Sequence, residues 1–73
     1  MKYPVGTLVT PGVEHPAVFR VAAAPVRGRY RLDPVNPDAE AYAARRMAQL
    51  RTDRVEIHSR WLDAYPRQDG GRA

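Results

Sequence analysis

The sequence contains no cysteine among its 73 residues, which excludes disulfide bonds and thiolate metal sites. A secreted domain of this size usually depends on such cross-links, so we expect a reducing, cytoplasmic setting. Long hydrophobic runs are missing too. No segment approaches the roughly 20 apolar residues that span a bilayer, and the first residues lack the apolar stretch of a signal peptide. We therefore expect no membrane association.

Lysine is almost absent: Lys2 is the single lysine, and the other basic residues are arginines, which leave a net charge of +4. Two explanations stay open. A GC-rich genome favours arginine and alanine codons. Alternatively, the arginines form a surface that binds phosphate or carboxylate, which a guanidinium group can do with two parallel hydrogen bonds. In either case the positive charge permits a polyanionic partner.

The length allows one domain, which we expect over residues 1–66. Residues 67–73 carry two consecutive glycines and no apolar anchor, so we expect a disordered tail there. The candidate core residues are Val5, Leu8, Val9, Val18, Phe19, Val21, Tyr30, Leu32, Val35, Tyr42, Met47, Leu50, Val55, Ile57, Trp61 and Leu62.

Residues 17–24 and 29–35 are predicted to form a β-hairpin around a tight turn at Pro25–Gly28. Apolar and charged residues alternate with the period of two that is typical of strands. The side chains predicted to face the core are Phe19, Val21, Tyr30 and Leu32. The side chains predicted to face outward are Arg20, Arg29 and Arg31.

A helix is predicted from Pro37 to about residue 51. Asn36 is a suitable N-cap, and proline is favoured at the first helical position. The predicted buried stripe is thin and rich in alanine, so we expect close packing. Its members are Ala39, Ala43, Met47 and Leu50.

Shorter strands are expected within residues 5–10, at 54–58 and at 63–65, with one 3₁₀ turn at 59–62. The segment from Val55 to Pro66 resembles the end of Src-homology-3-like (SH3-like) small barrels, in which a strand, a 3₁₀ turn with an aromatic and an aliphatic residue, and a closing strand follow one another. The segment from Tyr3 to Val9 is similar to the start of Tudor-like and KOW-like chains.

This resemblance implies a mainly β fold, a small barrel of about five strands with one inserted helix at about 37–51. The chain departs from the pattern in several places. It lacks the aromatic motif of the members that bind proline-rich peptides, the KOW glycine after the second strand, and a recognisable aromatic cage. Small arginine-rich domains of this kind are similar to those encoded by bacteriophages and other mobile elements.

No motif indicates catalysis. His15 and His58 are the only histidines, and neither has a second ligand at metal-binding spacing. The carboxylates show no pairing typical of acid–base work, and the glycines form no phosphate-binding loop. We therefore expect a protein that is not an enzyme and has no catalytic residues, cofactor or metal.

The basic hairpin is the main candidate site. Its predicted binding residues are Arg20, Arg27, Arg29, Arg31 and Arg54. Three interpretations stay open: a solvated sheet face, a site for nucleic acid or phosphate, and a site for an acidic protein. A second arginine cluster, Arg45, Arg46, Arg51 and Arg54, is interpreted as a solvated helix face.

Trp61 is predicted to lie in the core; exposed, it would be a hot spot for a protein partner. The first hypothesis is accordingly a non-enzymatic module that binds nucleic acid or a nucleoprotein through the basic hairpin. The alternative is a protein-interaction module, either a homodimer or a phage-encoded or mobile-element-encoded inhibitor or adaptor of a host complex. An enzyme subunit completed by another chain is a third hypothesis.

Overall fold

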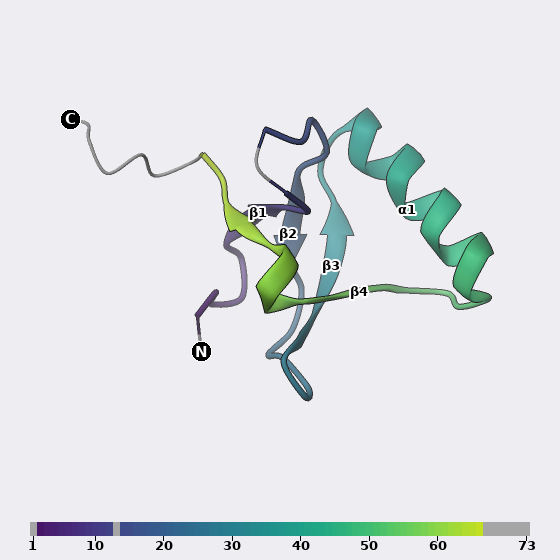
Figure 1. Cartoon of the computed structure of the whole chain (residues 1–73). Helices are drawn as coiled ribbons and strands as arrows, with labels where there is room; N and C mark the ends of the chain where they lie inside the picture. Colours follow the sequence, from purple (N-terminus) through teal and green to yellow (C-terminus); the bar gives the residue numbers. More distant parts are fainter. Residues whose placement is uncertain (1, 13, 67–73) are drawn as a thin grey trace.

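The computed structural model describes residues 2–12 and 14–66, which form a curled half-barrel of five antiparallel strands with one helix beside it (Figure 1). The order of strands across the sheet is β4-β3-β2-β1-β5. The elements are β1 (Leu8–Thr10), β2 (Phe19–Val21), β3 (Arg29–Pro34), α1 (Pro37–Leu50), β4 (Val55–His58), the 3₁₀ turn η1 (Ser59–Trp61) and β5 (Asp63–Ala64). The predicted mainly β fold with one helix and one 3₁₀ turn is confirmed.

The hairpin of β2 and β3 has the predicted two faces. Phe19, Val21, Tyr30 and Leu32 are buried, and the three arginines predicted to face outward, Arg20, Arg29 and Arg31, are exposed. The turn, however, is centred on Arg27 and Gly28, with φ of 53° and 78°, and so lies one residue later than the predicted turn at Pro25–Gly28. Two consecutive residues with positive φ give the turn a twist that matches the twist of the flanking strands. Val26 and Arg29 close it through two hydrogen bonds of 3.0 Å between their main-chain groups.

The predicted N-cap of α1 is confirmed and also ties the helix to the sheet. The Oδ1 atom of Asn36 accepts hydrogen bonds from the main-chain nitrogens of Ala39 at 2.9 Å and Val18 at 3.2 Å. Its Nδ2 atom donates to the main-chain oxygen of Pro16 at 2.9 Å. One side chain thereby fixes the start of the helix against the segment that enters β2.

Burial falls along α1 from its first turn to its last. Ala39 and Ala43 are buried, Met47 is half-buried, and Leu50 is 59% exposed. The expected core role of Leu50 is therefore wrong, because the last turn of the helix extends beyond the sheet that its first turns cover. Val5 and Val35, also expected in the core, are 58% and 40% exposed.

Tyr3 is a core residue that the periodicity did not identify. Its ring packs edge-on against the ring of Tyr30, with centroids 5.4 Å apart. Its main-chain nitrogen donates to the hydroxyl of Tyr30, and its own hydroxyl donates to the main-chain oxygen of Leu62, both at 3.0 Å. The N-terminal segment is thus fixed to β3 and to the residue that follows η1.

Within the described ranges, no helix combines the length and the apolar character that crossing a membrane requires. The expected tail at 67–73 lies outside the described residues.

Candidate functional site along the edge of strand β4

The arginines of the hairpin share one sheet face with acidic residues. The strand register places Arg20 opposite Asp33 and Arg31 opposite Glu56, whereas Arg29 lies opposite His58. All three arginines and both carboxylates are exposed. Directly opposed charges of opposite sign attract each other across a sheet, so two of these arginines are partly neutralised. The basic face predicted for the hairpin is therefore interrupted by negative charge.

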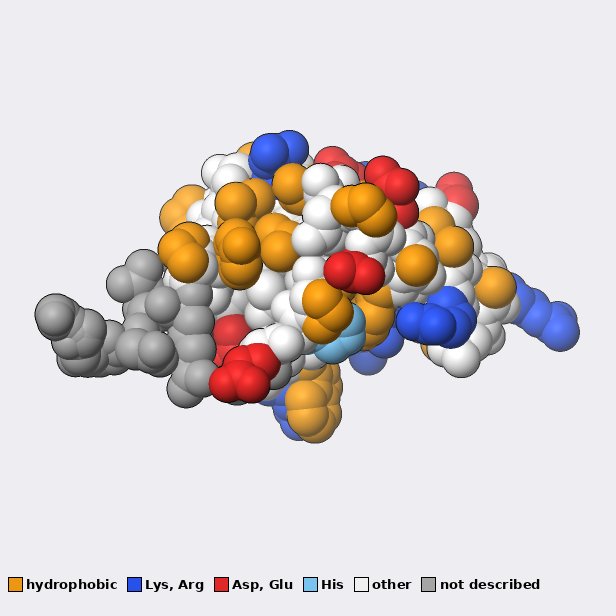
Figure 2. All heavy atoms as spheres, turned by 90° about the horizontal axis from the view of Figure 1, so that it is seen from above, with side chains coloured by type: hydrophobic (Ala, Val, Ile, Leu, Met, Phe, Trp, Pro, Cys, Tyr) orange, Lys and Arg blue, Asp and Glu red, His pale blue; other side chains and the backbone are white. Residues whose placement is uncertain are grey.

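The surface shows the same mixing of charges elsewhere. In Figure 2, which views the molecule from above, basic and acidic side chains are both scattered over the visible face and do not form one patch of a single sign. Among residues 2–12 and 14–66, the one ion pair within 4.0 Å joins Arg54 Nε to Asp53 Oδ1 at 3.5 Å. Both side chains of this pair are well exposed, so it contributes little to stability.

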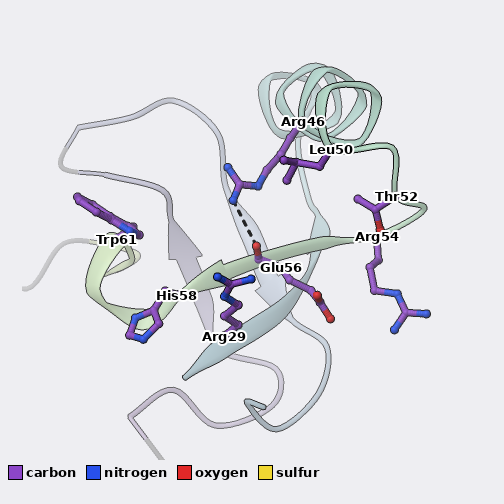
Figure 3. Close-up of a pocket in the computed structure, with 8 residues that line it drawn as sticks. All are labelled: Arg29, Arg46, Leu50, Thr52, Arg54, Glu56, His58 and Trp61. Carbon is purple, nitrogen blue, oxygen red and sulfur yellow. Dashed lines mark hydrogen bonds between the residues drawn. The ribbon is translucent and has the colours of Figure 1, made fainter. Parts of the chain in front are cut away.

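A groove with a volume of about 350 Å³ runs along β4 (Figure 3). Side chains from β3, α1, the connection between α1 and β4, β4 itself and η1 line it. They are Arg29, Arg46, Leu50, Thr52, Arg54, Glu56, His58 and Trp61. Trp61 stands at one end of β4 and Arg54 at the other, while Arg29 and Arg46 approach the strand from β3 and from the helix.

The groove brings together only part of the predicted site. Arg29, Arg54 and Trp61 all line it. Arg27 lies at the tip of the hairpin and lines an adjoining hollow together with Arg29 and His58. Arg20 lies on the sheet face at β2, and Arg31 lines a different hollow beside Asp33 and Met47.

Arg46 is the groove residue that sequence reasoning missed, since it was interpreted as part of a solvated helix face. It is half-buried, and its Nη2 atom donates to the main-chain oxygen of Glu56 at 3.4 Å. Its Nε atom is buried and has no hydrogen-bond partner among the described residues. Helical periodicity does not separate Arg46 from Arg45, because it does not show which flank of the helix the next strand passes.

Trp61 is 65% exposed, so its predicted core position is wrong. The next residue, Leu62, takes the core position and is 4% exposed. In a strand that continued the alternation of Val55 and Ile57, Trp61 would face the core. The 3₁₀ turn shifts the phase of this alternation, so Leu62 faces the core instead. An exposed indole on a short ordered turn is a typical contact for a partner.

Two hydrogen bonds hold the turn that carries Trp61. The Nδ1 atom of His58 accepts from the main-chain nitrogen of Arg60 at 3.1 Å, and the main-chain nitrogen of Leu62 donates to the oxygen of Ser59, also at 3.1 Å. The imidazole of His58 also packs beside Gly28 of the hairpin turn. His58 therefore has a structural role at the base of η1.

β4 is the last strand on its side of the sheet, so its outer edge has no neighbouring strand in the described structure. The main-chain nitrogen of Ser59 donates to Gly28 at 2.9 Å, and Ile57 lies opposite Tyr30. Main-chain groups of an antiparallel strand point alternately to its two sides. Those of residues 55, 57 and 59 therefore face β3, and those of Glu56 and His58 face the groove.

A second, more apolar hollow adjoins the same edge on the core side of the sheet. It has a volume of about 320 Å³, and its lining residues are Pro11, Tyr42, Arg46, Ile57 and Trp61. Arg46 and Trp61 line both this hollow and the groove. The two spaces therefore flank the free edge of β4, one on its charged side and one on its apolar side.

In the part of the chain that the structure describes, no group of three or more histidine, cysteine or acidic side chains is placed to hold a metal ion. His15 accepts a hydrogen bond from the main-chain nitrogen of Ala17 at 3.1 Å and packs edge-on against Tyr42. It is a structural loop residue.

A scan of protein-family models, a search of curated proteins and a search of solved structures each found no match for this chain.

Proposed function

We propose that this chain is a non-enzymatic protein-interaction module that binds its partner along the edge of β4. The observation that carries the proposal is the exposed Trp61 beside a groove along the edge of β4, an edge that pairs with no other described strand. Tryptophan and arginine are the residue types most enriched at energetically dominant interface positions. Here both types surround one concave surface, and the core packing of Leu62 keeps the indole in place.

Capture experiments with three forms of the chain test this proposal. The wild type, Trp61→Ala and Val5→Ala are immobilised and exposed to a lysate of the source cells, and retained proteins are identified and their affinities measured. Val5 is the matched control, because it is 58% exposed and does not line the groove. We expect one protein to bind the wild type and Val5→Ala, with an affinity at least about tenfold lower for Trp61→Ala. Equal binding by Trp61→Ala would contradict the proposal.

Self-association is the homodimer form of the same proposal. Sedimentation velocity over a range of concentrations distinguishes it from binding to another protein. A dimer that Trp61→Ala dissociates and Val5→Ala preserves would identify a second copy as the partner.

Nucleic-acid binding is the second candidate function. The convergence of Arg29, Arg46 and Arg54 near an exposed indole favours it, because single-stranded nucleic acids bind to basic grooves with aromatic stacking platforms. Glu56 within the groove and Asp33 on the sheet face weaken this candidate, since both repel phosphate. Binding of single-stranded DNA or RNA that falls steeply with salt, and that Arg29→Gln and Arg54→Gln also weaken, would establish this second function.

The lack of cysteine and the order of the elements support two further parts of the proposal. We place the chain in the cytoplasm and among the SH3-like small barrels. A phage or mobile-element origin is proposed with them.

A further inference from the structure

We infer that the partner contributes an extended segment with alternating apolar and acidic residues, which adds to the outer edge of β4 as another strand. This inference rests on the proposed function and specifies the chemistry of the partner. An added strand pairs through its main chain and is selected through its alternate side chains.

The main chain of β4 provides the pairing groups. The nitrogens and oxygens of Glu56 and His58 face away from β3, as the bond from Ser59 to Gly28 establishes through strand alternation. An extended segment alongside would form hydrogen bonds with both residues. Glu56 and His58 are two residues apart, and main-chain groups on one side of any strand repeat at this spacing. A partner strand of either direction therefore fits.

Arg46 is held weakly at this edge. Its bond to the oxygen of Glu56 is long at 3.4 Å, and its buried Nε atom has no partner in the described structure. A carboxylate from an incoming strand would accept from Nε and Nη2 together, which is the favoured geometry for an arginine–carboxylate pair. The displaced oxygen of Glu56 would then pair with the main chain of the incoming strand.

The two sides of the edge require different residue types. On the charged side, Arg29, Arg46 and Arg54 outnumber Glu56, so acidic side chains are favoured there. On the other side, Tyr42, Ile57 and Trp61 line the apolar hollow, so apolar side chains are favoured there. Neighbouring residues of an extended strand point to opposite sides. A partner strand that suits both sides of the edge therefore has apolar and acidic residues in alternation.

A synthetic octapeptide of alternating valine and aspartate, blocked at both ends, tests the inference. Trp61 is the single tryptophan of the chain, so its fluorescence reports binding at the groove directly. We expect a blue shift of the emission that saturates at or below about 1 mM peptide. We also expect slower hydrogen exchange of the Glu56 and His58 amides, while the amides of residues 55 and 57, which face β3, keep their slow exchange.

Three comparison peptides isolate the features that the inference requires. The first replaces aspartate with lysine, the second places all valines before all aspartates, and the third carries an N-methyl group on every second residue and so loses main-chain donors. We expect each change to weaken binding by about tenfold or more. Equal binding of any of the three would overturn the corresponding part of the inference, and tighter binding of an oligonucleotide at the same salt would overturn it as a whole.

Arginine variants supply a matched pair on the protein. Arg46→Gln removes the groove guanidinium, whereas Arg45→Gln changes the neighbouring exposed arginine, which does not line the groove. We expect weaker octapeptide binding for Arg46→Gln alone. If the octapeptide fails while the cellular partner still depends on Trp61, strand addition is wrong and the proposed interaction function stands. If that dependence is also absent, the proposed function is wrong as well.

Discussion

The guanidinium of Arg46 lies across the free edge of β4, with its Nη2 atom 3.4 Å from the main-chain oxygen of Glu56. A helix side chain therefore covers part of an edge that would otherwise present unpaired groups to solvent. Covering and charging an edge strand is a common way to prevent uncontrolled pairing with other chains. Because one long hydrogen bond holds the Arg46 side chain at this edge, a partner strand can displace it readily. This agrees with the proposed binding of a partner at the edge of β4.

Proline substitutions in β4 should distinguish its free edge from the edge that pairs with β3. Glu56→Pro removes an N–H group that faces the groove, so we expect a loss of only about 1–2 kcal/mol in the free energy of unfolding. Ile57→Pro removes an N–H group that faces β3 together with a core side chain, and should cost more than about 3 kcal/mol. Urea unfolding monitored by circular dichroism measures both. Similar losses for the two variants would show that the assignment is wrong, that is, that the N–H group of Glu56 does not face the groove while that of Ile57 faces β3.

Gly28→Ala should destabilise the hairpin turn. Gly28 has φ of +78°, and a Cβ atom there would lie 2.6 Å from Nε2 of His58. We expect a loss of about 1–3 kcal/mol, from backbone strain and from displacement of the imidazole. The same substitution in a His58→Ala background removes the steric part and should cost less. An equal cost in both backgrounds would assign the whole effect to the backbone.

Asn36→Ala should lower stability by more than a simple helix cap explains. The substitution removes the acceptor for the nitrogens of Ala39 and Val18 and the donor to Pro16. We expect a loss of about 2–3 kcal/mol, compared with about 1 kcal/mol for a typical N-cap. Asn36→Asp keeps the acceptor and loses the donor, so its melting temperature should fall between those of the wild type and Asn36→Ala. A loss near 1 kcal/mol for Asn36→Ala would mean that the contacts to the β2 segment contribute nothing.

Tyr3→Phe should weaken the attachment of the N-terminal segment to the chain after η1. It removes the donor to the main-chain oxygen of Leu62 at 3.0 Å, in a buried contact. We expect a loss of about 1–2 kcal/mol, which corresponds to a fall of several degrees in the melting temperature of a domain this small. Tyr65→Phe is the control, because Tyr65 is 47% exposed. Calorimetry should show a clear fall for Tyr3→Phe and almost none for Tyr65→Phe.

Local sequence signals predicted the faces and ends of the elements. The alternation in residues 29–32 and 55–57 assigned the inward and outward side chains correctly, because a strand alternates its side chains whatever its neighbours are. Asn36 and Pro37 located the start of α1 for the same kind of local reason. The turn was placed too early, since Pro25 and Gly28 are both turn residues and local preference does not decide between them.

The composition of the groove was not predictable in the same way. Arg46 and Arg45 have the same local character, and only the path of β4 past the helix makes one of them a groove residue. Trp61 and Leu62 are both hydrophobic residues after a strand, and the course of the chain from η1 into β5, which pairs with β1, decides which of them is buried.

The sequence by itself determined a small, cysteine-free, basic chain with a two-faced hairpin, a capped helix and a short turn after β4. The hairpin faces, the helix cap and the turn follow from interactions between residues a few positions apart, and the other features are those of the composition. The tertiary structure decided which charges oppose one another across the sheet, which edge of β4 is free and which aromatic side chain is exposed. Those features depend on strand register and on contacts between distant segments. Interactions between residues that are neighbours in the sequence do not determine them.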